Sequence, residues 1–300
     1  MLSFKYEVFL EVARQLSFSK ASQNLYISQP AVSKHVKQLE AYYKMTLIER
    51  KGNSISLTPV GKYLYEKLLT AKKLQQETDF EIGQMSKTFK PATVLRFGAS
   101  TTVALYILPP VLSAYKKLNP GLEISLINRN SENIINALLS HEIDLGITEG
   151  LGKLNTIVYK PFITDEVIAV CSLKNKLYKK SSLQVKDIVS IPIALRERGS
   201  GTLAALQKAL ENKNIKIADL NVVIRLAGTE ALKNFIVADE CIGFLPRRAV
   251  LKELKYNELA VLKIRDLKIT REFYFIQRKG EESNPVNSHF IRFASKFYNQ

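Results

Sequence analysis

The sequence predicts an all-α N-terminal domain with a winged helix-turn-helix, a long linking helix, and an α/β C-terminal domain of two lobes. Three observations predict this arrangement. A helix cap, a short turn and two apolar helical stripes follow one another over residues 17–40. Apolar residues then recur at spacings of three and four from Val60 to Met85. After Lys90, strand-like segments alternate with helix-like segments.

The stretch 17–40 has the pattern of two helices joined by a tight turn. Ala21 and Leu25 share one helical face, which belongs to the helix before the turn. Ser28 is a favourable N-cap, and Pro30 lies in the first turn of the next helix, where its missing N–H costs nothing. That helix has an apolar stripe made of Val32, Val36 and Leu39. An ordinary helical hairpin is the alternative, and it requires the cap, the turn and the stripe to coincide by chance.

The polar face of the second helix has the chemistry that contacts DNA. Its hydrogen-bonding and cationic side chains can read base edges and phosphates. They are Gln29, Ser33, Lys34 and Lys37. An apolar stripe between Phe4 and Ala13 supplies a further helix upstream. Downstream, the β-prone runs 47–50 and 54–57 enclose a turn and predict a wing, with Arg50 and Lys51 near its tip.

The composition favours a folded protein with a polyanionic partner. Of the 300 residues, 46% are hydrophobic, so disorder is not expected, and the formal net charge is +16. Residues 1–90 hold 14 Lys and Arg against 8 Asp and Glu, a net charge of +6, whereas the rest hold 30 against 20, a net charge of +10. The positive charge is therefore spread over the chain, and part of it can serve an anionic ligand or solubility.

Several classes of protein are disfavoured. No apolar stretch approaches the roughly eighteen residues of a membrane span, and the N-terminus lacks the pattern of a signal peptide. We therefore expect a cytoplasmic protein that does not enter a membrane. Cys171 and Cys241 have apolar neighbours and are expected to be buried, reduced thiols. No Cys and His cluster has the spacing of metal ligands, so we expect neither a metal nor a cofactor.

The segment after the wing predicts one long helix. Thr58 can cap it, and Pro59 then occupies its first position. The apolar spacing continues to about Lys87, which gives a length of roughly 43 Å. We expect this narrow stripe to pack against a copy of itself as a coiled coil, and the alternative is a helix that lies on its own domain. Residues 90–92 break the pattern and mark a hinge.

The remainder predicts repeated βαβ units, which form open sheets covered by helices. Because residues 91–300 are too many for one small sheet, we expect two lobes with a cleft between them. The expected strands are 94–98, 122–128, 144–148, 191–195, 222–226, 242–245 and 273–276. The expected helices are 105–119, 131–141, 201–212, 229–237 and 288–298.

Small hydroxyl residues follow several of these strands and open the next helix. Ligands of open α/β sheets lie at this edge, and hydroxyls with free helix N–H groups can hold a small anion. The loops are 99–102, 198–202 and 228–230, with 148–150 as a weaker fourth, and Arg196 and Arg198 can add charge. The candidate ligand residues are Ser100, Thr101, Thr102, Thr148, Arg198, Ser200, Gly201, Thr202 and Thr229. Routine helix capping is the alternative for any one loop.

Enzymatic motifs are absent from the sequence. No phosphate-binding loop, dinucleotide fingerprint or nucleophile elbow is present, so we predict that the protein is not an enzyme. The three histidines, His35, His141 and His289, are expected to be surface or capping residues. Two rival functions stay open on the residues alone. One is an architectural DNA-binding protein whose α/β part is an oligomerisation scaffold, and the other is an enzyme with an incidental helical N-terminus.

With these residues laid out, the chain resembles the LysR-type transcriptional regulators over its whole length. The most specific matches are residues 17–19, 28–33, 39–40, Arg50 and 57–61, and weaker ones are 144–147 and 243–246. The run 196–202 is similar to that of members that answer to sulfur or carbon metabolites. The chain departs from the family pattern at Ser22, at 43–44, at Ile48 and at 239–241.

The resemblance implies a function and an assembly. It implies a DNA-binding domain (1–59), a dimerisation helix (60–90) and a periplasmic-binding-protein-like regulatory domain (91–300), with lobe I at 91–162 and 268–300 and lobe II at 163–267. The chain then crosses between lobes near 162–163 and 264–270. DNA contacts fall on Gln29, Pro30, Ser33, Lys34, Lys37 and Arg50, and the matched motif adds Ser17 and Ser19.

By the same resemblance, a small and preferably anionic metabolite binds between the lobes and controls DNA binding or bending. Two linker helices pair into a homodimer, and two dimers form a tetramer. A dimer places its recognition helices on two half-sites, so the double-stranded operator is expected to be an interrupted palindrome. RNA polymerase is a candidate partner of the bound regulator.

Overall fold

The computed structural model describes residues 2–51, 54–85, 94–150, 152, 154–282 and 284–298. The chain divides into two compact units, Met1–Pro91 and Ala92–Gln300. The expected hinge at 90–92 lies outside the described residues. Within the described residues, no helix has the length and apolar character to cross a membrane, and no cluster of His, Cys, Asp and Glu has the geometry of a metal site.

The first unit is a winged helix-turn-helix, as predicted. Ser17 and Ser28 cap the second and third helices by accepting hydrogen bonds from the backbone N–H groups of Lys20 and Ala31. The apolar stripe of the third helix packs on the first two helices through a core that includes Val8, Val12, Ala21, Val32 and Val36. The elements are α1 (Phe4–Gln15), α2 (Phe18–Leu25), α3 (Gln29–Tyr43), β1 (Ile48–Lys51), β2 (Ser54–Leu57) and α4 (Pro59–Met85).

The long helix α4 divides its apolar side chains between two roles. Leu68 is buried in a core with Phe9 and Leu47, so the first half of α4 packs on its own domain. This corrects the expectation that the whole stripe packs against a copy of itself, because α1 and the segment before β1 supply an apolar surface for its first half. Further along, Leu74 and Ile82 are 64% and 47% exposed. The coiled-coil expectation therefore applies to the second half alone.

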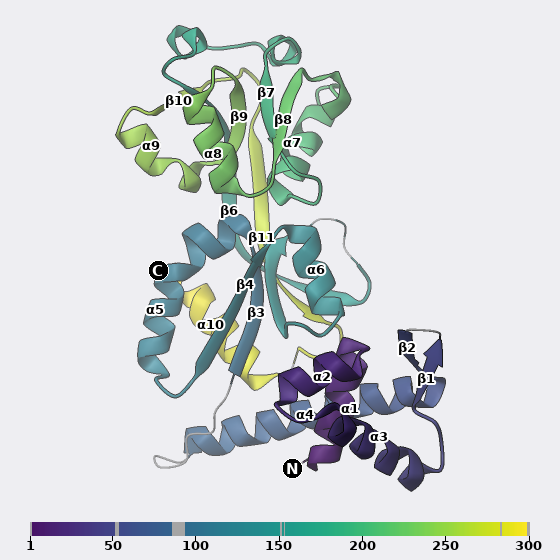
Figure 1. The fold of residues 1–300 in the computed structure, drawn as a ribbon. Helices are drawn as coiled ribbons and strands as arrows, with labels where there is room; N and C mark the ends of the chain where they lie inside the picture. The colour runs from purple at the N-terminus through teal and green to yellow at the C-terminus, as the bar shows by residue number, and fades with distance from the viewer. Residues whose placement is uncertain are drawn as a thin grey trace. The chain divides into compact units, whose positions relative to one another are not determined.

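The second unit is built on one nine-stranded sheet that runs through two lobes (Figure 1). Its strand order is β4-β3-β5-β11-β6-β9-β7-β8, and β10 pairs with β6. Pairing is parallel among β3, β4 and β5 in lobe I and among β7, β8 and β9 in lobe II. The strands are β3 (Val94–Ser100), β4 (Glu123–Arg129), β5 (Leu145–Glu149), β6 (Ile157–Ser172), β7 (Ile193–Arg196), β8 (Val222–Leu226), β9 (Ile242–Pro246), β10 (Leu259–Leu262) and β11 (Ile269–Arg278).

Helices cover the two lobes separately. In Figure 1, α5, α6 and α10 lie around the strands of lobe I, and α7, α8 and α9 lie around those of lobe II. A short π-helical segment, η1 (Val103–Ile107), leads into α5, so the expected helix at 105–119 begins earlier than predicted. The helices are α5 (Leu108–Leu118), α6 (Ser131–Leu139), α7 (Gly201–Glu211), α8 (Thr229–Ala238), α9 (Leu251–Lys255) and α10 (Pro285–Tyr298), with 3-10 turns at Lys176–Lys179, Val185–Val189, Ile217–Asp219 and Arg247–Ala249.

Two long strands connect the lobes. β6 and β11 pair antiparallel from Ile157 opposite Arg278 to Val167 opposite Ile269, and both run through the junction between the lobes (Figure 1). β6 and β10 were not predicted from the sequence, and only residues 273–276 of β11 were. Charged residues and Pro161 interrupt the apolar alternation of β6, because the middle of this strand lies at the junction between the two lobes and not in the core of either. The sheets expected for the two lobes are thereby joined into one.

The two cysteines are free and buried, as expected. Cys171 on β6 packs in one core cluster of lobe II and Cys241, just before β9, packs in another. Burial raises the pKa of Cys171 to about 11, and burial together with the charge of Asp239 raises the pKa of Cys241 to about 12. Both therefore stay protonated and unreactive at neutral pH.

Candidate functional site

The residues predicted to contact DNA lie on α3 and at the start of α2. Gln29, Pro30, Lys34 and Lys37 are exposed, and Ser17 and Ser33 are half-buried. Ser19, at the start of α2, donates a hydrogen bond of 3.3 Å from Oγ to Oε1 of Gln29, so α2 orients the first side chain of α3. The side chains of Arg50 and Lys51 lie outside the part of the chain that the structure describes.

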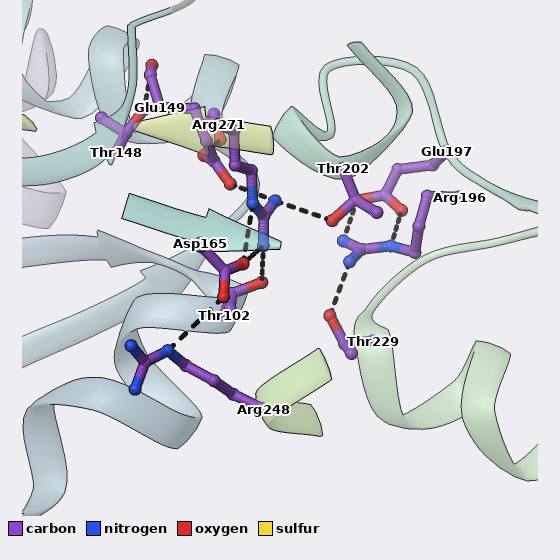
Figure 2. A network of polar contacts seen from close by, with 11 residues as sticks. Thr102, Thr148, Glu149, Asp165, Arg196, Glu197, Thr202, Thr229, Arg248 and Arg271 are labelled. Carbon is purple, nitrogen blue, oxygen red and sulfur yellow. Dashed lines mark hydrogen bonds and ion pairs between the residues drawn. The ribbon is translucent and has the colours of Figure 1, made fainter. Parts of the chain in front are cut away.

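Arg271 on β11 is the centre of a buried polar network in the second unit (Figure 2). Its Nε and Nη2 donate to Oδ2 of Asp165, at 3.0 and 2.7 Å. Nη1 donates to Oε1 of Glu149 at 2.6 Å and to Oγ1 of Thr202 at 2.9 Å. Nη2 also donates to Oγ1 of Thr102 at 2.9 Å. A guanidinium has five N–H groups, so every donor of Arg271 has an acceptor within the protein.

These bonds join the two lobes. Thr102 follows β3 in lobe I, and Thr202 lies in the first turn of α7 in lobe II, so one side chain holds both hydroxyls at once. The side chains of Arg271, Glu149 and Asp165 are 4%, 5% and 1% exposed. Buried charges are stable only when they are paired and hydrogen-bonded, and this network meets both conditions.

Glu149 fills the space at the start of α7. Its Oε2 accepts a hydrogen bond from Oγ of Ser131, the first residue of α6. A Cβ added to Gly201 would lie 2.1 Å from the Glu149 carboxyl carbon. The chain therefore needs glycine at position 201 to let this carboxylate approach. Thr148 is fully buried, and its Oγ1 donates to the backbone carbonyl of Glu149 at 2.8 Å.

A second buried arginine lies on lobe II. Arg196, at the end of β7, donates from Nη1 to Oγ1 of Thr229 at 2.7 Å and contacts both carboxylate oxygens of Glu197, at 2.7 and 2.9 Å. Burial alone would raise the pKa of Glu197, but the hydrogen bonds and charge of Arg196 outweigh it and hold that pKa below its usual value. We expected Arg196 to offer charge to a ligand, whereas Glu197 neutralises it. Arg198 is exposed instead.

The lobes also touch at their rims. The hydroxyl of Tyr106 in lobe I donates to Glu230 at the start of α8 in lobe II. Burial and this carboxylate raise the pKa of Tyr106 well above its usual value, so the phenol stays a donor. On another side, the side chain of Asn130 donates to the carbonyl of Arg198, and the backbone N–H of Glu132 donates to that of Gly199, each at 3.3 Å. This is a closed arrangement of the two lobes.

A buried hydroxyl and a cavity are the two features of this site that could contact a ligand. Ser100 is 3% exposed, and its Oγ has no hydrogen-bond partner among the described residues. Beside Arg271 and Glu149 lies a cavity of about 380 Å³, whose other lining residues include Gly201 and Lys208 of α7 and Tyr274 of β11. Among the other predicted ligand residues, Ser200 is buried and Thr101 is half-buried.

Most of the residues that organise the site were not predicted from the sequence. Thr102 and Thr202 were predicted as ligand residues and Glu149 lies in the weaker candidate loop 148–150, but Arg271 and Asp165 were not predicted. A signal for Arg271 was present, because Ile269, Arg271 and Phe273 alternate with exposed residues on one strand. A charged residue on the buried face of such a strand needs buried partners.

Comparisons with known proteins agree with this architecture. Residues 90–298 match the LysR substrate binding domain, and residues 5–62 match the bacterial regulatory helix-turn-helix proteins of the lysR family. The transcriptional regulator CysL of Bacillus subtilis is 26% identical over 292 residues, which cover 97% of this chain and 96% of CysL.

Two solved structures show the same fold. The regulatory domain of CcmR from Synechocystis PCC6803, solved in complex with 2-PG, has a TM-score of 0.62 and 25% identity, and covers 68% of this chain and 96% of that domain. Full-length CbnR, solved with its target DNA, has a TM-score of 0.62 and 17% identity, with 99% of both chains covered.

CysL is a regulator of transcription, which sets the enzymatic alternative aside. The chain belongs to the LysR family of DNA-binding transcriptional regulators, with an N-terminal helix-turn-helix and a C-terminal effector-binding domain.

Proposed function

We propose that this regulator senses a small anionic metabolite in the cleft between its lobes, and that the metabolite changes DNA binding or DNA bending. A ligand shifts the equilibrium between two arrangements of the lobes and subunits only by binding one arrangement better than the other. The observation that carries the proposal is Arg271, whose bonds to Thr102 and Thr202 join the two lobes. A ligand that enters this network alters how the lobes are held.

The cleft offers polar groups for such a ligand. The Ser100 hydroxyl has no hydrogen-bond partner in the described part of the chain, and Ser200 and Thr202 lie at the start of α7, where helix N–H groups favour an anion. The candidate ligand residues remain those of the loops at the strand ends, together with Thr148 and Thr229. The CcmR regulatory domain in complex with 2-PG supports a small molecule as the ligand of a domain of this fold.

We further propose a cytoplasmic, bacterial protein that forms a homodimer through α4 and a tetramer from two dimers. The exposed Leu74 and Ile82 in the second half of α4 support the pairing of this helix with a second copy. A dimer carries two α3 helices, so its operator is expected to be an interrupted palindrome. We propose Gln29, Ser33, Lys34, Lys37 and the wing as the DNA contacts, and RNA polymerase as a further partner.

A thermal-shift screen of the full-length protein against small anions and acidic metabolites tests the sensing function. A ligand at a hundred times its Kd stabilises the folded state by about 2.7 kcal/mol, which raises the melting temperature by a few degrees. We expect this rise to disappear in Ser100→Ala and in Thr202→Val and to persist in Ser181→Ala, which alters an exposed serine.

Two results would count against the proposal. A rise that persists in both cleft variants would place the ligand elsewhere. No rise with any compound, and no change in DNA affinity with them, would favour the architectural scaffold.

A further inference from the structure

Glu149 holds a position that suits the anionic group of a ligand. One carboxylate oxygen accepts from Arg271 and the other from Ser131 Oγ, and the carboxyl carbon lies against Gly201 at the start of α7. A guanidinium, a hydroxyl and a helix start are three groups by which proteins bind free carboxylates and oxyanions. We call the space bounded by Arg271, Ser131 and Gly201 the anion seat.

The anion seat is full in this structure. Because all five N–H groups of Arg271 have acceptors, a free anion can bind Arg271 only when one acceptor leaves. Asp165 accepts two of these bonds, is 1% exposed and has Arg248 as a second cation at 3.5 Å. If the Asp165 side chain moved away from Arg271, it would therefore lose its ion pairs with both Arg271 and Arg248.

Of the two carboxylates that accept from Arg271, Glu149 is better placed to leave. It lines the cavity of about 380 Å³, and Asp165 is not among the residues that line it. Lys208 of α7 lines the same cavity and offers a cation to a carboxylate that turns outward. The exchange conserves charge pairing, since the incoming anion replaces Glu149 at Arg271.

We propose that Glu149 is an internal ligand of the anion seat, and that a free carboxylate or oxyanion exchanges with it. Arg271 then binds either Glu149 or the acidic group of the effector. This inference rests on the proposed sensing function and specifies its chemistry. In this arrangement the protein itself supplies the carboxylate that pairs with Arg271.

Chemical rescue of full-length Glu149→Ala tests the exchange. This variant vacates the anion seat, so its melting temperature is expected to fall and then to rise by a few degrees, saturably, with added acetate or formate. Chloride at equal ionic strength is the control. Wild type is expected to show no saturable rise, and neither is Glu149→Gln, because its amide still fills the seat. The double variant Glu149→Ala, Arg271→Met is expected to lose the rescue.

A second experiment uses any anionic compound that stabilises wild type in the thermal-shift screen, and compares its affinity for the two proteins. Its affinity for Glu149→Ala is expected to exceed that for wild type by about tenfold or more, because the internal competitor is gone. Equal or weaker affinity overturns the exchange, as does an acetate response that matches chloride or survives in the double variant. If Glu149→Ala is not recovered folded, Glu149→Ser, whose short side chain also vacates the anion seat, enters the same titration.

The two proposals fail in different ways. Without an anion seat, the acetate rescue is absent while the screen still yields hits that depend on Ser100 and Thr202. Without a sensing function, the acetate rescue of Glu149→Ala remains while wild type responds to no metabolite.

Discussion

Arg271 and Glu149 form an ion pair with its closest atoms 2.6 Å apart, and their side chains are 4% and 5% exposed. Arg129 and Glu142 have the same closest separation, 2.6 Å, but are 42% and 43% exposed. The two pairs share their chemistry and differ in burial. The two pairs therefore allow the stability contribution of a buried ion pair to be compared with that of an exposed one in the same protein.

We expect Arg271→Met to destabilise the second unit by about 3–5 kcal/mol, because it leaves the buried Glu149 without its cation and leaves Asp165 with Arg248 alone, at 3.5 Å. The matched Arg129→Met is expected to cost under about 1 kcal/mol, since its partner is solvated. Urea unfolding followed by circular dichroism measures both. Equal losses in the two variants would show that burial does not set the value of the Arg271 pair.

Gly61 is required by the contact between α4 and the segment before β1. A Cβ at this position would lie 2.0 Å from the carbonyl oxygen of Leu47. Gly61→Ala is therefore expected to destabilise the first unit by about 1–3 kcal/mol through overpacking. The control is Lys62→Ala, an exposed neighbour, which should stay within about 0.5 kcal/mol of wild type. Thermal unfolding of both variants decides whether the contact is as tight as described.

Gln29 is expected to read a base edge, because it is exposed at the start of α3 and held by Ser19. Gln29→Ala should reduce the ratio of affinities for the operator and for random DNA, with a loss of about 1–3 kcal/mol. Binding assays on an operator selected from random DNA measure this ratio. Gln38→Ala, on the same helix, is the control. An equal loss on both DNAs would refute a base-reading role for Gln29.

Lys37 is expected to contact phosphate. Lys37→Ala should weaken binding to all DNA sequences and reduce the slope of log affinity against log salt by about 0.9. Lys174→Ala removes an exposed lysine from the second unit and should leave the slope unchanged. If the slope is unchanged in Lys37→Ala as well, this side chain faces solvent in the complex.

Glu11 links α1 to α2 and makes the first unit sensitive to acid. Burial would raise its pKa, but the hydrogen bonds from Asn24, Gln15 and Arg14 and the charge of Arg14 outweigh it, so the pKa lies below its ordinary value of 4.5. A carboxyl whose pKa is lowered by folding contributes stability above its unfolded pKa and loses it as the pH falls through its folded pKa.

Glu11→Gln is therefore expected to be less stable than wild type at pH 7 and to lose less stability on acidification below about pH 4.5. Melting temperatures between pH 3 and 7 check this. A variant whose acid profile parallels that of wild type would show that Glu11 has the same pKa in the folded and unfolded chains.

The helix-turn-helix could be predicted because its signals are local. All of them lie within the twelve residues 28–39: the cap at Ser28, Pro30 in the first turn, and the stripe at Val32, Val36 and Leu39. β6 could not be predicted in the same way. Its 16 residues pass from one lobe to the other, so the burial of its side chains follows the two lobes and not a regular alternation.

The sequence by itself determined the order of domains, the helix-turn-helix and the hydroxyl-rich loops at the strand ends, because caps, turns and apolar periods act over a few residues. Only the tertiary structure decided what those loops surround. Arg271 meets Thr202, Glu149 and Thr102 across 69, 122 and 169 residues of sequence. A buried charge takes the partners that the folded chain places within hydrogen-bond distance, and no local pattern specifies them.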